Sequence, residues 1–212
     1  METLQGGLGL ISKGGIIMVP ILICSVIALA IIIERLIYLK RSRENVEALS
    51  SGIKQWLDKG NPAKALELCD QSSGPVGNIF RAGLENRTNP KWKLEEKLSL
   101  AGQEELQKMG KNIRGLEIIA AISPLMGLLG TVIGMVQAFN RVAEFQGQVN
   151  PSLLAGGIWE ALLTTAAGLA VAIPVLVMLH LFERNIEKAG FLMEKSAQFL
   201  VHFLDEKGFG QA

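Results

Sequence analysis

The sequence predicts an all-α membrane protein with three transmembrane helices and long cytoplasmic helical extensions. Three long runs contain no charged residue, apart from His180 near the end of the third: 14–33, 118–139 and 161–182. Because a helix rises about 1.5 Å per residue, about 20 such residues cross the roughly 30 Å hydrocarbon core of a bilayer. A chain of 212 residues with 49% hydrophobic composition could also form one soluble domain, but charge-free runs of this length argue against it.

The first run is predicted to be a retained span and not a cleaved signal peptide. Residues 1–10 lack the positive charge that opens a signal peptide, and the long apolar run ends at Glu34 and Arg35. Cys24 lies in this span and Cys69 in the segment that follows, so a disulfide between them would join different environments. Both are predicted to be free thiols with packing roles.

The net charge of +1 says little about partners, but the positions of the Lys and Arg residues predict the orientation of the chain. On one side of the membrane lie Lys40, Arg41, Arg43, Lys108, Lys111, Arg114, Arg184 and Lys188, and near the opposite ends of the spans lie Lys13 and Arg141. The N-terminus is therefore predicted outside and the C-terminus in the cytoplasm. The predicted division is an outer N-terminal segment (1–13), transmembrane helix 1 (14–39), a cytoplasmic helical region (40–115), transmembrane helix 2 (116–140), an outer loop (141–156), transmembrane helix 3 (157–182) and a cytoplasmic C-terminal helix (183–212).

The region between the first two spans is predicted to begin with a small helical hairpin. Asn61-Pro62 is a turn signal followed by proline at a first helical turn, so a second helix is predicted over 63–69. Gly74-Pro75 and residues 86–90 then break the pattern. The first helix, in 45–57, is predicted from apolar residues at intervals of three and four, which share one helical face: Val46, Leu49, Ile53, Trp56 and Leu57.

Two long helices are predicted to extend from the membrane into the cytoplasm. Residues 92–114 contain no proline and lead into the second span, although Gly110 and Gly115 weaken that continuity. Residues 183–203 continue the third span in the same way.

Small and hydroxyl side chains recur on one face of the second and third spans. Close helix packing explains one such stripe, since small residues let membrane helices approach and threonine can bond its own backbone. Two stripes on successive spans favour a shared polar path. The stripes are Gly127, Thr131, Gly134 and Ala138 in the second span, and Ala161, Thr165, Gly168 and Ala172 in the third.

Glu160 stands immediately before the charge-free run of the third span. One interpretation is a carboxylate at the membrane interface, stabilised by the dipole at the start of the helix. The other is a mouth or relay for a cation. The pairs Glu34 with Arg35 and Arg114 with Glu117 lie at cytoplasmic span ends, where long side chains can reach water, and structural roles are predicted for them.

Several kinds of chemistry have no residues to support them. The sequence lacks H-E-x-x-H, G-x-S-x-G, a P-loop and clustered Cys/His ligands, so it predicts no enzyme, no metal site, no cofactor and no nucleic-acid partner. No carboxylate lies deep in any predicted span. A proton that crosses beside the threonine hydroxyls would therefore need a titratable group from a partner.

The two polar spans resemble the ExbB/TolQ/MotA group of proton-channel subunits, and most closely the ExbB-type biopolymer transport proteins of its three-span ExbB and TolQ branch. Trp159 departs from the pattern, because a smaller residue is expected there. The matching residues are Pro124, Gly127, Leu128, Leu129, Gly130, Thr131, Val132 and Gly134 in one span, and Gly157, Ile158, Glu160, Ala161, Leu162, Thr165, Gly168, Leu169, Ala172, Ile173 and Pro174 in the other.

The resemblance implies a homopentamer in the inner membrane of a Gram-negative bacterium, with the second and third spans around a central pore and the first facing lipid. It also implies an ExbD- or TolR-like dimer in the pore, whose membrane aspartate carries the proton, and a TonB- or TolA-like protein. Thr131 and Thr165 then correspond to pore hydroxyls and Glu160 to the acidic residue at the start of the third span. Helix packing is assigned to Gly127, Gly130, Gly134 and Gly168.

Three functions agree with these residues. The first is an ExbB-like, pore-forming subunit of a proton-driven motor that serves TonB-dependent uptake. The second is a TolQ-like subunit that supports envelope integrity. The third is a structural membrane scaffold without ion flux, whose glycine faces only pack helices.

Overall fold

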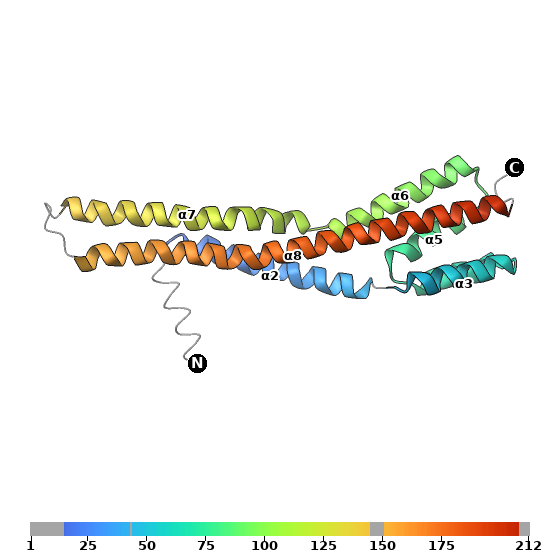
Figure 1. Cartoon of the computed structure of the whole chain (residues 1–212), viewed down its shortest axis with the longest axis horizontal. Helices are drawn as coiled ribbons and strands as arrows, with labels where there is room; N and C mark the ends of the chain where they lie inside the picture. The colour runs from blue at the N-terminus through green and yellow to red at the C-terminus, as the bar shows by residue number, and fades with distance from the viewer. Residues whose placement is uncertain (1–14, 43, 145–150, 208–212) are drawn as a thin grey trace, which may run out of the picture. The chain divides into compact units, whose positions relative to one another are not determined.

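The computed structural model describes residues 15–42, 44–144 and 151–207, and each element among them is an α-helix (Figure 1). Three of the helices, α2, α7 and α8, are long and apolar enough to cross a membrane, which confirms the predicted fold class. The predicted outer segment 1–13 and residues 145–150 of the predicted outer loop lie outside the described residues. The helices are α2 (Met18–Arg41), α3 (Val46–Asp58), α4 (Pro62–Gln71), α5 (Pro75–Glu85), α6 (Lys91–Gly110), α7 (Ile113–Glu144) and α8 (Pro151–Glu206).

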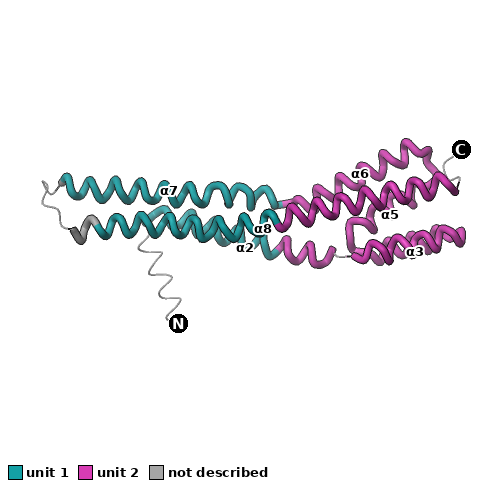
Figure 2. The backbone as a smooth tube through the Cα atoms, viewed as in Figure 1, with its two compact units in different colours: residues 1–33, 112–180 teal, residues 34–111, 181–212 magenta. Residues whose placement is uncertain are grey.

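The chain divides into two compact units, coloured separately in Figure 2. Unit 1 comprises Met1–Ile33 and Asn112–His180 and contains most of α2, all of α7 and the first half of α8. Unit 2 comprises Glu34–Lys111 and Leu181–Ala212 and contains α3 to α6 with the second half of α8. Most residues of the three predicted spans therefore lie in unit 1, and the shorter helices lie in unit 2.

The predicted helical hairpin is confirmed as α3 and α4 of unit 2. Asn45 caps α3, since its Oδ1 accepts a hydrogen bond of 3.1 Å from Ala48 N, and Asn61 caps α4 in the same way, at 3.2 Å from Lys64 N. An asparagine oxygen in this position satisfies one of the free N–H groups at a helix start. The sequence signal at Asn61-Pro62 thus marks a real helix boundary.

The start of α5 is capped by a residue distant in the chain. Gly74 precedes α5 and has no side chain to accept from its free N–H groups. The Glu44 carboxylate instead accepts from Val76 N at 2.7 Å and Gly77 N at 3.1 Å, and from Ser72 Oγ at 2.5 Å. A carboxylate also interacts favourably with the positive end of a helix dipole. Glu44 therefore fixes the segment after α2 to the start of α5.

Unit 2 has a continuous apolar core. The Phe80 ring meets Phe199 edge-on, with centroids 6.5 Å apart, and Phe199 stacks on Phe203 at 6.2 Å. Cys69 is a free, buried thiol in this core, and burial raises its pKa to about 11. The core comprises Ile53, Leu57, Ala65, Cys69, Val76, Ile79, Phe80, Leu84, Leu94, Leu98, Met193, Leu200, Phe203 and Leu204.

The predicted continuity between residues 92–114 and the second span is wrong. Helix α6 ends at Gly110, and α7 starts afresh at Ile113. Between them Asn112 has φ of 64°, a left-handed conformation that asparagine tolerates better than most residues. The chain therefore turns at this point.

Arg35 supports the end of α6. Its Nη1 donates to the carbonyl oxygens of Lys108 at 3.1 Å and Met109 at 3.3 Å, and its Nη2 donates to Glu34 Oε1 at 2.6 Å. Only 4% of the Arg35 side chain is exposed, so the expectation that it reaches water is wrong. Its structural role is to satisfy carbonyls that a helix end leaves without partners.

The third span continues without interruption into unit 2, as predicted. Helix α8 has 56 residues, from Pro151 to Glu206. Because α7 extends to Glu144 and α8 begins at Pro151, parts of the range predicted as the outer loop, 141–156, are helical.

Candidate functional site

Helices α7 and α8 of unit 1 meet along a seam of glycines. An added Cβ on Gly127 would lie 2.9 Å from Thr165 Cα, and one on Gly134 would lie 2.9 Å from Ala161 Cβ. A Cβ on Gly168 would lie 2.5 Å from the Ser123 carbonyl oxygen, and one on Gly130 would collide with the Thr164 side chain. Real Cβ atoms do not approach other atoms this closely, so all four glycines assigned to helix packing lie where a side chain has no room.

Thr165 lies in this seam and joins the two helices. Its Oγ1 donates to the Gly127 carbonyl oxygen across the seam at 2.8 Å, and its side chain is half-buried. This contact falls one helical turn before Thr131 on α7. The hydroxyl proton of Thr165 is therefore engaged in packing, while its oxygen can still accept a hydrogen bond.

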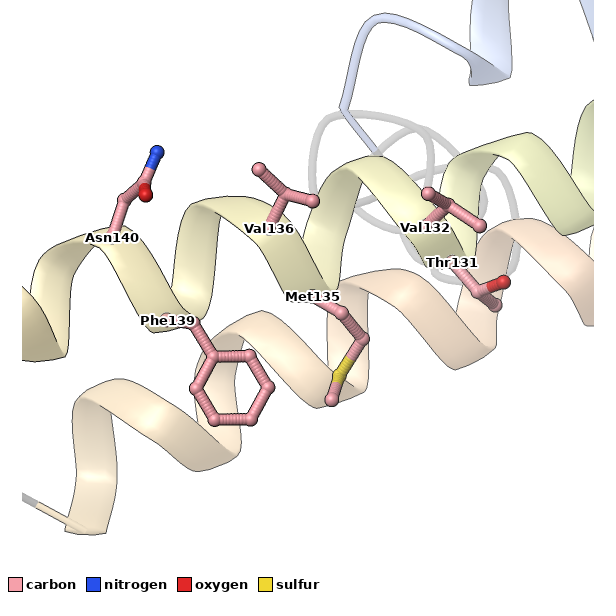
Figure 3. Close-up of a pocket in the computed structure, with 6 residues that line it drawn as sticks. All are labelled: Thr131, Val132, Met135, Val136, Phe139 and Asn140. Carbon is pink, nitrogen blue, oxygen red and sulfur yellow. The ribbon is translucent and has the colours of Figure 1, made fainter.

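Thr131 lines a hollow of about 490 Å³ on α7 (Figure 3). Its Oγ1 donates to the Leu128 carbonyl oxygen of its own helix at 2.6 Å. Like the Thr165 hydroxyl, the Thr131 hydroxyl can still accept a hydrogen bond. The other residues that line the hollow also belong to α7: Val132, Met135, Val136, Phe139 and Asn140.

Glu160 does not lie at the start of its helix. Because α8 begins at Pro151, Glu160 stands nine residues along it, and the effect of a helix dipole falls off within the first turn. The interpretation that the α8 dipole stabilises Glu160 is therefore wrong. The half-buried carboxylate instead lies against Gly15, just before α2, so closely that a Cβ on Gly15 would collide with Glu160 Oε1.

Two buried hydroxyls of the seam were not singled out from the sequence. Thr164 is 2% exposed, and its Oγ1 donates to the Ala161 carbonyl oxygen at 2.7 Å. Ser123 is fully buried, and its Oγ has no hydrogen-bond partner among the residues that the structure describes. Thr164 fits the stripe of the third span as well as Thr165 does, so spacing alone did not separate them.

The site thus combines the Glu160 carboxylate with three threonine hydroxyls and a close backbone seam, and the threonines lie in stretches of α7 and α8 that contain no carboxylate. All three threonines donate to carbonyl oxygens, so toward a ligand they act as acceptors. Hydroxyls that accept hydrogen bonds suit a protonated acid or a water molecule, because each of these has a proton to donate. It supplies no nucleophile paired with a base.

Comparison with known proteins agrees with this description. A family model described as the MotA/TolQ/ExbB proton channel family matches residues 71–195, which include every predicted site residue. The chain is 34% identical over 190 residues to "Putative biopolymer transport protein ExbB-like 3" of Synechocystis, covering 87% of this chain and 89% of that protein. It is 32% identical over 184 residues to "Biopolymer transport protein ExbB" of Salmonella typhimurium, covering 80% and 72%. With "Biopolymer transport protein exbB1" of Vibrio cholerae it shares 28% identity over 208 residues, covering 97% and 89%.

Proposed function

Because this chain belongs to the MotA/TolQ/ExbB proton channel family, we propose that it is the pore-forming subunit of a proton-driven motor in the inner membrane of a Gram-negative bacterium. Its family is one of membrane channels and not of enzymes. In the ExbB-like role the motor transmits the proton-motive force to an outer-membrane process, TonB-dependent uptake. The similar proteins carry names of biopolymer transport, which supports this choice.

The observation that carries the proposal is that the threonine hydroxyls act as acceptors in stretches of α7 and α8 that contain no carboxylate. Thr131 lies on a hollow of α7, and Thr165 lies one turn away in the seam with α8. Residues 161–182 contain no carboxylate, so the chain offers hydroxyl acceptors without a deep acid. A protonated aspartate from an ExbD- or TolR-like partner would donate to such acceptors and lose a buried charge at the same time.

The proposed assembly is a homopentamer around that partner, a dimer, with a TonB- or TolA-like protein as the further link. Residues 14–39, 116–140 and 157–182 are the proposed spans, the N-terminus is periplasmic and the C-terminus cytoplasmic. Helix α2 faces lipid. Its exposed apolar surface supports that placement, since these side chains are 48–68% exposed: Val19, Ile23, Val26, Ile27, Leu29 and Ile33.

In the proposed mechanism the partner's aspartate takes up a proton from outside and its helix then moves past the threonines. Each elementary charge that crosses the membrane releases about 2.3 kcal/mol per 100 mV. Several protons in succession would rotate the partner relative to the pentamer and so perform work. Glu160 lies near the outer end of this path and receives protons there.

The test is the double variant Thr131→Val with Thr165→Val. We expect loss of proton flux in vesicles that contain the full complex, and loss of proton-dependent uptake in cells, at normal protein levels. Thr88→Val, outside the spans, is the matched control and should behave as the natural protein. Full flux in the double variant would contradict the pore role of both threonines.

The seam itself favours a second candidate, a structural scaffold without ion flux, because Thr165 already bonds across it. That function predicts a stable assembly, no partner in its centre and no flux in vesicles with the full complex. A TolQ-like role in envelope integrity predicts the same flux as the ExbB-like role. Co-purification with a TolA-like instead of a TonB-like protein would identify it.

A further inference from the structure

A small cavity lies within unit 1 where the segment before α2 meets α7 and α8. Its volume is about 30 Å³. It is lined by glycines and isoleucines together with three polar residues, Gln137, Glu160 and Thr164. The complete lining is Gly15, Ile16, Ile17, Gly130, Ile133, Gly134, Gln137, Glu160 and Thr164.

The polar residues of this cavity offer both kinds of hydrogen-bonding group. Thr164 Oγ1 already donates to the Ala161 carbonyl oxygen, so it can only accept from a molecule in the cavity. The Glu160 carboxylate accepts when ionised, and the Gln137 amide can donate. A molecule that donates twice and accepts once would satisfy all three.

We propose that this cavity binds one water molecule, which donates to Glu160 and to Thr164 Oγ1 and accepts from the Gln137 amide. Water is the ligand whose size and hydrogen bonding both fit, since a polar cavity of this volume holds about one water with two to four partners. The bound water connects Glu160 with the hydroxyl of Thr164, a residue that is 2% exposed, which makes Thr164 and Gln137 further residues of the proton path. Only this last step rests on the proposed function.

Gly15 keeps the cavity open on the side of α2. Its φ of 65° is strained for a residue with a side chain, and a Cβ there would collide with Glu160 Oε1. The position of the carboxylate therefore depends on glycine at this point. The start of the first span thus contributes to a site whose polar side chains come from the other two.

The experiment is electron cryo-microscopy of the full-length protein in lipid nanodiscs, at a resolution that shows ordered water. We expect a single peak at hydrogen-bond distance, about 2.5–3.2 Å, from Glu160 and from Thr164 Oγ1. The peak should vanish in Thr164→Val and persist in Thr164→Ser, which keeps the hydroxyl. An empty cavity, a peak at the shorter distances of a bound cation, or a peak unchanged in Thr164→Val would each overturn the proposal.

Proton flux in vesicles with the full complex separates the water site from the channel function. We expect Thr164→Val to lower the flux about fivefold, as loss of one hydrogen bond in the path implies, and Thr164→Ser to restore it. A water peak without flux in the natural protein would refute the proposed function and leave the site intact. Normal flux in both variants would refute the role of the water in the path and leave the function intact.

Discussion

Replacing Gly168 with alanine probes how closely α7 and α8 approach. The added Cβ would lie 2.5 Å from the Ser123 carbonyl oxygen and 3.2 Å from Gly127 Cα, whereas ordinary contact begins at 3.4 Å. Both neighbours are backbone atoms, so the helices must separate by roughly 0.9 Å. A shift of that size would stretch the 2.8 Å hydrogen bond from Thr165 to Gly127 beyond the normal range.

The energy follows from three contributions. Overpacking of this kind costs about 1–3 kcal/mol. Loss of an interhelical hydrogen bond in a membrane costs about 0.6 kcal/mol more. The better helix propensity of alanine offsets about 0.8–1 kcal/mol of this cost. We therefore expect Gly168→Ala to lower the free energy of unfolding by about 1–3 kcal/mol.

Titration of the purified full-length protein with SDS in mixed micelles, followed by far-UV circular dichroism, measures this change. Gly156→Ala is the matched control, because Gly156 is an exposed glycine of the same helix with nothing within 4 Å of an added Cβ. It should unfold at the same SDS fraction as the natural protein or slightly higher. If both variants behaved alike, the seam would not be as tight as the structure shows.

Two further predictions concern unit 2. Glu44→Ala removes the acceptor from the start of α5 and should destabilise that helix by about 1–2 kcal/mol, seen as faster hydrogen exchange at Val76. Glu47→Ala, an exposed neighbour on α3, should leave that exchange unchanged. Because burial raises the pKa of Cys69 from 9.0 to about 11, its thiolate fraction at pH 8 should be about 100-fold lower than that of a free thiol. With Cys24 replaced by alanine, alkylation should be correspondingly slow in the folded protein and rise toward pH 11.

Each of these two predictions has an outcome that would contradict it. Equal exchange in the two glutamate variants would mean that Glu44 does not cap α5. Alkylation of folded Cys69 at the rate of an unfolded control would mean that the thiol is not buried as the structure places it.

Local signals in the sequence predicted most of the fold. Charge-free runs of the length of a bilayer predicted the three long apolar helices, and Asn61-Pro62 predicted the boundary between α3 and α4. These signals depend on neighbouring residues, which the sequence displays directly. The break after Gly110 was not predicted, because α6 ends where Arg35 from α2 donates hydrogen bonds to its last carbonyl oxygens and where Asn112 turns the chain.

The candidate site shows the same division. The sequence by itself determined that the second and third spans carry stripes of small and hydroxyl residues, because helical periodicity is a property of spacing. Only the tertiary structure decided how the seam covers the two threonines: Thr164 is buried against Gly130, and the half-buried Thr165 donates across the seam to Gly127. It also decided that Glu160 meets Gly15 before α2. Adjacent threonines differ by about 100° around a helix, so the partner helix alone determines which of them it covers.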